Sequence, residues 1–187
     1  YCHSKVSQCS SSAISACSKT DGLSANSLTC VCGTKTCNSD SGLFCRSAMN
    51  ACSKSSIFYS YVESEFCGSV TEKHELGTKA ACEAAAVSLG MYDTKAYVQS
   101  SSIRPPGCWK FPGNNPSNPN TGSLYFNPRT TSATKCGAAI SPNPAATCLC
   151  ATGPICSETD STTSNSAECI CGGAACTLVT GLYCDSS

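Results

Sequence analysis

The sequence predicts a small disulfide-rich fold made of tandem cysteine-rich modules, mostly irregular or β in structure, with one principal α-helix at about residues 72–89. Three observations lead to this prediction. The chain has 19 cysteines among 187 residues, a density typical of disulfide scaffolds. The spacing of six cysteines recurs unchanged later in the chain. Large apolar side chains are sparse, so cross-links, at about 2–4 kcal/mol for an isolated bridge, are expected to replace much of a conventional core.

The composition argues against nucleic acid as a partner and against a membrane-spanning helix, and it indicates a compartment. Charged residues make up 13% of the chain, and 12 basic residues balance 12 acidic ones. Binding to nucleic acid needs a basic surface that neutralises phosphates, so nucleic acid is not an expected partner. No apolar run approaches the roughly 20 residues of a membrane-spanning helix. Disulfides at this density persist only under oxidising conditions, which predicts an extracytoplasmic protein.

An internal repeat defines the modules. Its six cysteines are spaced 8, 13, 2, 5 and 8 residues apart, and the second copy follows at an offset of 139 residues. Between residues 17–45 and 156–184, 13 of 29 aligned positions are identical. We therefore divide the chain into a first repeat module at 1–52, a middle module at 53–147 and a second copy of the repeat at 148–187. The cysteines expected to form structural disulfides are Cys9, Cys17, Cys30, Cys32, Cys37, Cys45, Cys52, Cys67, Cys82, Cys108, Cys136, Cys148, Cys150, Cys156, Cys169, Cys171, Cys176 and Cys184.

Both ends of the chain resemble parts of further modules. Cys2 precedes Cys9 by the same seven-residue step that separates Cys45 from Cys52. The residues around Cys184 match the start of this motif. We therefore expect the natural polypeptide to extend beyond one or both ends. Because the cysteine count is odd, Cys2 or Cys184 is expected to lack a partner within this chain. A free reactive thiol is the alternative explanation.

The middle module has its own pattern of elements. Residues 57–66 are rich in aromatics and predict a strand or an exposed contact ribbon. Apolar residues follow a helical period from about residue 72 to Gly90, which ends the helix, and they occupy two faces, which predicts packing on both sides. Residues 105–107 predict a turn that brings Cys108 to its partner. Residues 112–122 predict a polar loop and residues 124–127 a short strand.

The order of these motifs resembles a known kind of module. An alanine-rich helix with a cysteine is followed by Arg104–Trp109 (RPPGCW), by Leu124–Asn127 (LYFN) and by the C-x-C step at Cys148. Over about residues 67–150, with flanking CxCG…GL[FY]C units, this order is similar to cysteine-rich extracytoplasmic repeat modules of dinoflagellate and related algal proteins. The resemblance implies an algal source and makes the thylakoid lumen a candidate compartment, where proteins often serve as accessory subunits of photosystems. It carries over no known activity and no catalytic residues.

No catalytic constellation is recognisable in the sequence. The two histidines are His3 and His74, and His74 lies among charged neighbours at the predicted helix start. The motifs of serine hydrolases, zinc proteases and phosphate-binding loops are absent, and the carboxylates are scattered. The C-x-C steps could hold zinc or copper, but the longer gaps between the other cysteines favour bridges over a compact four-ligand site. We therefore expect a protein that is not an enzyme and has no metal or cofactor.

Aromatic side chains are the remaining candidates for binding. Together with one amide, the candidate residues are Tyr59, Tyr61, Trp109, Tyr125, Phe126 and Asn127. Trp109 and Phe126 are expected first of all to fill the core. The leading hypothesis is a structural and interaction module whose aromatics anchor protein partners in a larger extracytoplasmic assembly. That assembly would be an algal photosystem, on its lumenal side, or a cell-surface or flagellar structure.

Three alternatives stay open. The first is a secreted carbohydrate-binding module, in which aromatic rings stack on a glycan and Asn115, Asn118 and Asn127 donate hydrogen bonds. The second is a redox or metal-storage protein with many free thiols. The third is a secreted inhibitor that uses the loop at 112–122.

Overall fold

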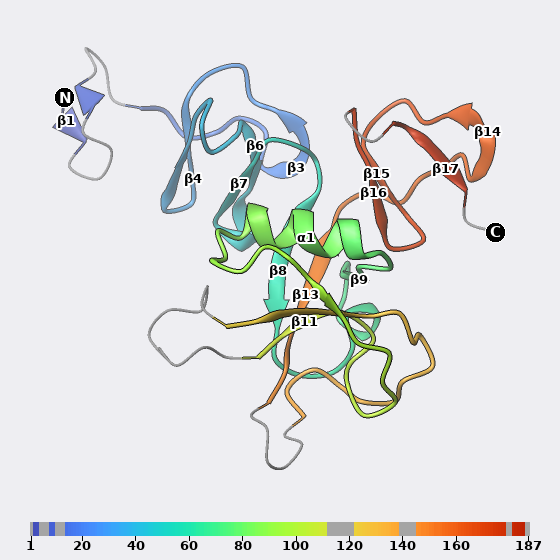
Figure 1. Ribbon diagram of the computed structural model, residues 1–187. Helices are drawn as coiled ribbons and strands as arrows, with labels where there is room; N and C mark the ends of the chain where they lie inside the picture. Colours follow the sequence, from blue (N-terminus) through green and yellow to red (C-terminus); the bar gives the residue numbers. More distant parts are fainter. Residues whose placement is uncertain are drawn as a thin grey trace. The chain divides into compact units, whose positions relative to one another are not determined.

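The structure is a computed structural model. It describes residues 14–111, 122–138, 145–178 and 181–185, together with the backbone of two strands, Cys2–His3 and Gln8–Cys9. The chain divides into two compact units, Tyr1–Ser56 and Ile57–Ser187, which Figure 1 shows as ribbons. Short strands and irregular segments dominate, with one α-helix among the described residues. The predicted fold class, a disulfide-rich and mostly β or irregular protein with one principal helix, is therefore confirmed.

The elements are short, as expected where cross-links set the structure. The strands are β1 (Cys2–His3), β2 (Gln8–Cys9), β3 (Asp21–Ala25), β4 (Cys30–Cys32), β5 (Lys35–Cys37), β6 (Phe44–Arg46), β7 (Ala51–Ser53), β8 (Phe58–Val62), β9 (His74–Glu75), β10 (Tyr97–Val98), β11 (Gly107–Lys110), β12 (Leu124–Asn127), β13 (Thr147–Thr152), β14 (Asp160–Ser164), β15 (Cys169–Cys171), β16 (Ala174–Cys176) and β17 (Tyr183–Asp185). The helix is α1 (Lys79–Ser88), and two 3₁₀ turns are η1 (Ser47–Met49) and η2 (Cys67–Ser69). The unit boundary after Ser56 lies close to the predicted division at 52/53, whereas the predicted division at 147/148 falls inside β13.

Disulfide-bonded cysteines form the core of the first unit, where a larger domain would have aliphatic side chains. Its strands form a three-stranded sheet in the order β3-β6-β7 and the hairpin β4-β5. Three disulfides connect them: Cys17–Cys30, Cys32–Cys45 and Cys37–Cys52. These half-cystines make up the buried cluster of the unit. Cross-links, more than apolar burial, therefore hold this unit together.

The second unit is organised around a mixed sheet. The strand order is β10-β12-β11-β13-β8, and β9 also pairs with β13. Side chains of a strand alternate between its two faces, so Leu149 and Ala151 of β13 pack with α1, while Cys148 and Cys150 pack with Trp109 on the other face. In Figure 1, α1 passes over the ends of β8 and β13. Both faces of the sheet are therefore covered.

Each face of this sheet is also cross-linked. The disulfide Cys82–Cys108 joins α1 to β11. On the other face, Cys136–Cys148 and Cys67–Cys150 join two preceding segments to β13. The two cysteines of the C-x-C step in β13 therefore bond different partners from the same face of one strand.

The helix begins later than predicted. It spans Lys79–Ser88 instead of residues 72–89, and the side chain of Thr78 caps its first turn. The preceding His74–Glu75 pairs with β13 as a strand. The backbone N–H of Gly77 donates a hydrogen bond of 2.9 Å to the carbonyl of Gly173. These tertiary contacts outweigh the helical periodicity of the sequence, because propensity is only a weak prior.

One face of the helix is buried, not two. Ala81, Cys82, Ala85 and Ala86 are buried, whereas Val87 is 64% exposed. The prediction of packing on both sides was therefore wrong. Alanine favours helix in solvent as well as in a core, so a helix this rich in alanine shows apolar periodicity on faces that water contacts. The C-terminal repeat joins this unit through Ile170, which belongs to the same core cluster.

Candidate functional site

Eight disulfides account for every described cysteine side chain except that of Cys176. The expectation named Cys2 or Cys184 as the unpaired residue, but Cys184 bonds Cys171. The side chains of Cys2 and Cys9 lie outside the described residues. This number of bridges fits an oxidising extracytoplasmic environment.

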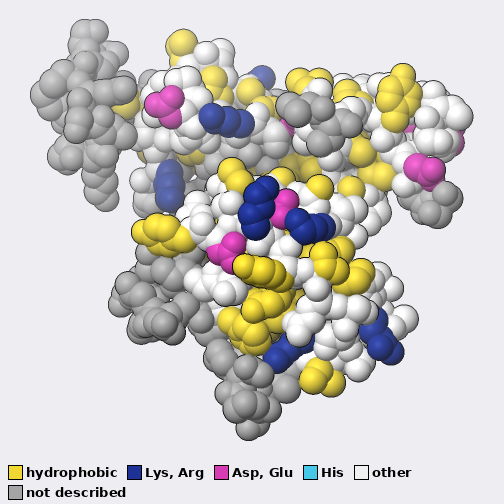
Figure 2. Space-filling model, viewed as in Figure 1, with side chains coloured by type: hydrophobic (Ala, Val, Ile, Leu, Met, Phe, Trp, Pro, Cys, Tyr) yellow, Lys and Arg dark blue, Asp and Glu magenta, His cyan; other side chains and the backbone are white. Residues whose placement is uncertain are grey.

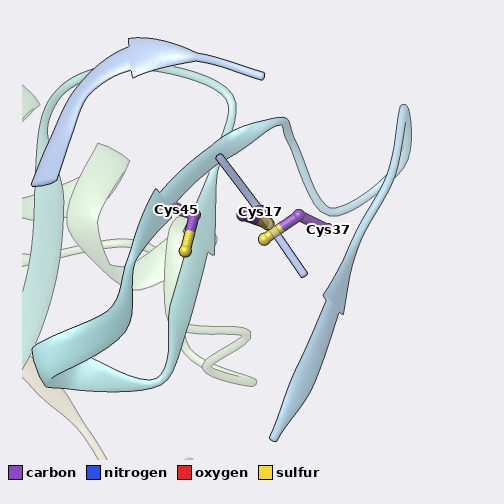
Figure 3. A group of neighbouring side chains, drawn as sticks. All are labelled: Cys17, Cys37 and Cys45. Carbon is purple, nitrogen blue, oxygen red and sulfur yellow. The ribbon is translucent and has the colours of Figure 1, made fainter. Parts of the chain in front are cut away.

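A group of three sulfurs in the first unit has the compactness of a metal site. The sulfurs of Cys17, Cys37 and Cys45 lie within 4.8 Å of one another, and Figure 3 shows these side chains coming from three different segments. Each sulfur is already bonded to another cysteine. Metals bind the deprotonated thiolate, so as disulfides these residues offer no such ligand. The arrangement is a packed cystine cluster.

The second repeat has a matching group in Cys156, Cys169 and Cys176. Cys156 and Cys169 are bonded to each other, which leaves the single thiol of Cys176. Burial raises the pKa of this thiol, so it is protonated at neutral pH, and its Sγ lies 3.6 Å from the carbonyl oxygen of Tyr183. One protonated thiol is not a metal centre.

A buried asparagine organises each cystine module. The Nδ2 of Asn26 donates to the carbonyls of Lys19 and Leu43 at 2.8 and 3.1 Å, and its Oδ1 accepts from the backbone N–H of Lys19 at 3.0 Å. Asn165 makes the equivalent bonds in the second copy, at 2.8, 3.0 and 3.0 Å. Buried polar groups need such partners. Both copies of the repeat have asparagine at this position, and this shared residue was the sequence signal for its structural role.

Trp109 is the centre of an aromatic stack inside the second unit. It is fully buried and stacks on Tyr125 with a centroid distance of 4.4 Å and an interplanar angle of 10°. Phe111 contacts it edge-on at 4.9 Å. The guanidinium of Arg104 lies 5.6 Å from the Trp109 ring and 4.9 Å from the Phe111 ring, a cation–π arrangement. With no exposed surface, Trp109 has no face on which a sugar could stack.

Asn127 is likewise occupied by its own fold. Its Nδ2 donates to the carbonyls of Ser101, Arg104 and Pro105 at 2.8, 3.1 and 3.1 Å. Its Oδ1 accepts from the backbone N–H groups of Ser101 and Arg129, each at 3.1 Å. The side chain therefore fixes the turn before β11 and has no group left for a ligand. The loop at 112–122, apart from Gly122, lies outside the described residues, and Asn115 and Asn118 lie there too.

The other predicted aromatics are divided between the faces of the sheet. Phe126 is 7% exposed and belongs to the core cluster beneath α1. Tyr59 and Tyr61 are half-buried against that same cluster, and burial raises the pKa of both phenols, with the charge of Glu168 adding to the effect on Tyr59. Trp109 and Tyr125 belong to the cluster on the opposite face. The structure therefore does not assemble the predicted binding residues into one surface.

The exposed apolar surface lies elsewhere in this unit. Tyr92 is 80% exposed, Tyr97 64%, Val98 60% and Ile103 58%. Tyr97 and Val98 form β10, at the edge of the sheet. Figure 2 shows hydrophobic side chains gathered on one face of the Ile57–Ser187 unit. Sequence reasoning missed these residues, because residues 92–103 have neither helical nor strand periodicity.

Comparison of this chain with known proteins found no relative. No protein family, curated protein or solved structure matches it. His74 was expected at the start of the helix, but it lies in β9, which pairs with β13. The side chain of His3 lies outside the described residues. No helix in the described part of the chain is long and apolar enough to cross a membrane.

Proposed function

We propose that this chain is a non-catalytic structural and interaction module that docks on a larger extracytoplasmic protein assembly. The observation that carries the proposal is the group of exposed apolar side chains at Tyr92, Tyr97, Val98 and Ile103. Aromatic residues are enriched where proteins meet.

The segment that carries these side chains is held rigidly. Glu83 of α1 accepts a hydrogen bond of 3.1 Å from the backbone N–H of Ala96. Asp93 accepts one of 3.1 Å from the backbone of Leu124 in β12. At its other end, Asn127 holds the backbone of Ser101. A surface that is already ordered loses less conformational entropy on binding, which supports a docking role.

The cross-links and the order of the motifs both support the proposed compartment. The disulfides fit an oxidising extracytoplasmic environment. The resemblance to algal cysteine-rich modules supports an accessory subunit on the lumenal side of a photosystem, or a component of a cell-surface or flagellar structure. In each case the module would act as a rigid adaptor.

The test compares two surface variants in the native assembly. The protein is isolated from its source under gentle, non-reducing conditions, and its native mass and cross-linked neighbours are measured. Recombinant wild type and the double variant Tyr97→Ser/Val98→Ser are then titrated against the isolated assembly. Removing two apolar anchors is expected to weaken binding at least about tenfold, since single anchors often contribute more than about 1 kcal/mol.

Leu178→Ser is the matched control. Leu178 is 80% exposed in the same unit but lies far along the chain from the proposed surface, and it should leave affinity unchanged. A protein that stays monomeric and binds nothing in its native membranes or cell surface would contradict the proposed function. Equal affinities for wild type and the double variant would contradict the proposed surface.

A further inference from the structure

The described residues include a buried cation, Arg104, that has no acidic partner among them. Arg104 is 8% exposed, and no carboxylate in the described part of the chain forms an ion pair with its guanidinium. The segments outside the described residues contain neither aspartate nor glutamate, so they supply no acidic side chain either. Buried charges in proteins are normally paired, because burial removes the hydration of a charged group. The side chains of this chain therefore provide no counter-charge for Arg104.

Two donor groups in the same ring cluster also lack an acceptor. The Nη1 of Arg104 and the Nε1 of Trp109 are buried, and neither has a hydrogen-bond partner among the described residues. The guanidinium lies 5.6 Å from the Trp109 ring. Guanidinium and indole N–H groups can donate but cannot accept, so the two groups cannot satisfy each other. A group that accepts hydrogen bonds and carries a negative charge would satisfy both.

The neighbouring rings compensate the charge of Arg104 only in part. A cation close to an aromatic ring is attracted by the negative face of its π system, and Arg104 has two such rings, those of Trp109 and Phe111. The rings do not replace a conventional acceptor for the buried N–H groups, and an unsatisfied buried donor lowers stability. The ring contacts therefore position the guanidinium without neutralising it.

The backbone of Arg104 is fixed in place. Its carbonyl oxygen accepts hydrogen bonds from the Nδ2 of Asn127, at 3.1 Å, and from the hydroxyl of Ser132. Two prolines follow Arg104 in the chain, and they restrict the backbone at and just before their own positions. The cation is therefore held at a defined place. A group that is ordered in advance loses less entropy when it binds a ligand.

Glu75 is an acidic residue on the same face of the sheet, but it does not neutralise Arg104. Glu75 pairs with Cys150 and Trp109 pairs with Cys148, and side chains two positions apart on one strand point to the same face. Burial raises the pKa of the Glu75 carboxyl, whereas a cation close by would lower it. The carboxyl therefore has the properties of a group without a neighbouring cation.

We propose that Arg104 binds a halide ion. One guanidinium balances one negative charge, so a divalent sulfate or phosphate would leave a net charge buried at this place. The surroundings are apolar, because Trp109, Phe111 and the disulfide Cys136–Cys148 belong to one cluster. Such surroundings favour a small monovalent anion that gives up its hydration readily. The site does not depend on the apolar surface proposed above.

Iodide is the probe, because it quenches the fluorescence of a tryptophan that it contacts. Trp109 is the only tryptophan and has no exposed surface, so collisions from solvent should quench it little. The full chain, with its disulfides intact, is titrated with sodium iodide at constant ionic strength, and gluconate is the bulky anion that iodide replaces. Arg104→Gln removes the charge. Arg129→Gln is the matched control, since Arg129 is exposed.

Quenching by iodide should saturate in the wild type and in Arg129→Gln, and chloride should reverse it by competition. The apparent affinity for iodide should fall at least about tenfold in Arg104→Gln, since a charge-assisted hydrogen bond is lost. Quenching that is absent in the wild type, or that rises linearly with iodide, would overturn the proposal whether or not the Arg104→Gln variant folds. Equal affinities for the two folded variants would overturn it as well. Saturable quenching that acetate reverses and chloride does not would identify a carboxylate site and would also refute the halide.

Discussion

Replacement of Asn127 by alanine tests how far one buried amide holds the turn before β11. The carbonyl of Pro105 would lose a buried hydrogen bond, and an unsatisfied buried group costs about 1–3 kcal/mol. The carbonyl of Arg104 would keep its bond from the hydroxyl of Ser132. The backbone of Ser101 is partly exposed, so water can replace some of what it loses. We therefore expect the free energy of unfolding of the Ile57–Ser187 unit to fall by about 1–3 kcal/mol.

The measurement is denaturant unfolding with the disulfides intact, followed by the fluorescence of Trp109. This residue is the only tryptophan and is fully buried in the same unit, so its emission reports unfolding there. Thr131→Ala is the control, because Thr131 is exposed close by in the chain, and its effect should stay within about 0.5 kcal/mol. A loss below about 1 kcal/mol for Asn127→Ala, at an unchanged denaturant dependence, would refute the reasoning. The turn would then be held by its prolines and not by the amide.

Three further perturbations follow from the structure. Asn26→Ala and Asn165→Ala should each lower the free energy of unfolding by about 1–3 kcal/mol; chemical denaturation measures both, and clearly unequal losses would show that the two amides are not equivalent. Replacing Cys67 and Cys150 together by alanine opens a bridge with a sequence separation of 83 and should cost about 4–5 kcal/mol by loop entropy, so an unchanged denaturation midpoint would contradict the cross-linked description of the sheet. Burial raises the pKa of Glu75, so the folded chain binds this proton more tightly than the unfolded chain, and stability falls as pH rises between the two pKa values. Glu75→Gln should therefore raise stability at neutral pH and flatten that part of a pH series of denaturation curves; lower stability at neutral pH would show that the carboxylate is favoured in place.

Cysteine spacing predicted the fold class because the spacing is a local property that can be counted directly in the sequence. The recurrence of a six-cysteine pattern with glycines at fixed offsets predicted two similar modules, and the two copies do fold alike. The spacing did not predict which cysteines pair, since six cysteines allow about 15 connectivities. The start of the helix could not be predicted in the same way. Gly77 lies close to Gly173, nearly a hundred residues later, and that contact turns the predicted first turns of the helix into a strand and a cap.

The sequence was a poor guide to which residues are available for binding. Trp109 is the only tryptophan of the chain, and Asn127 has an amide that can bind a ligand, which made them candidates, yet both side chains are used within the fold. Whether an aromatic faces a ligand or a neighbouring ring depends on tertiary contacts such as that of Trp109 with Tyr125. The exposed residues at β10 had no pattern to mark them.

The cystine cluster of the first unit has a consequence for how the protein responds to temperature. The heat-capacity change of unfolding comes mainly from the hydration of newly exposed apolar surface. In this unit the buried cluster consists of half-cystines, which stay bonded and partly shielded when the backbone unfolds. The heat-capacity change should therefore be small for its length, and its stability curve correspondingly flat. A module built in this way keeps nearly the same stability from cold to warm surroundings.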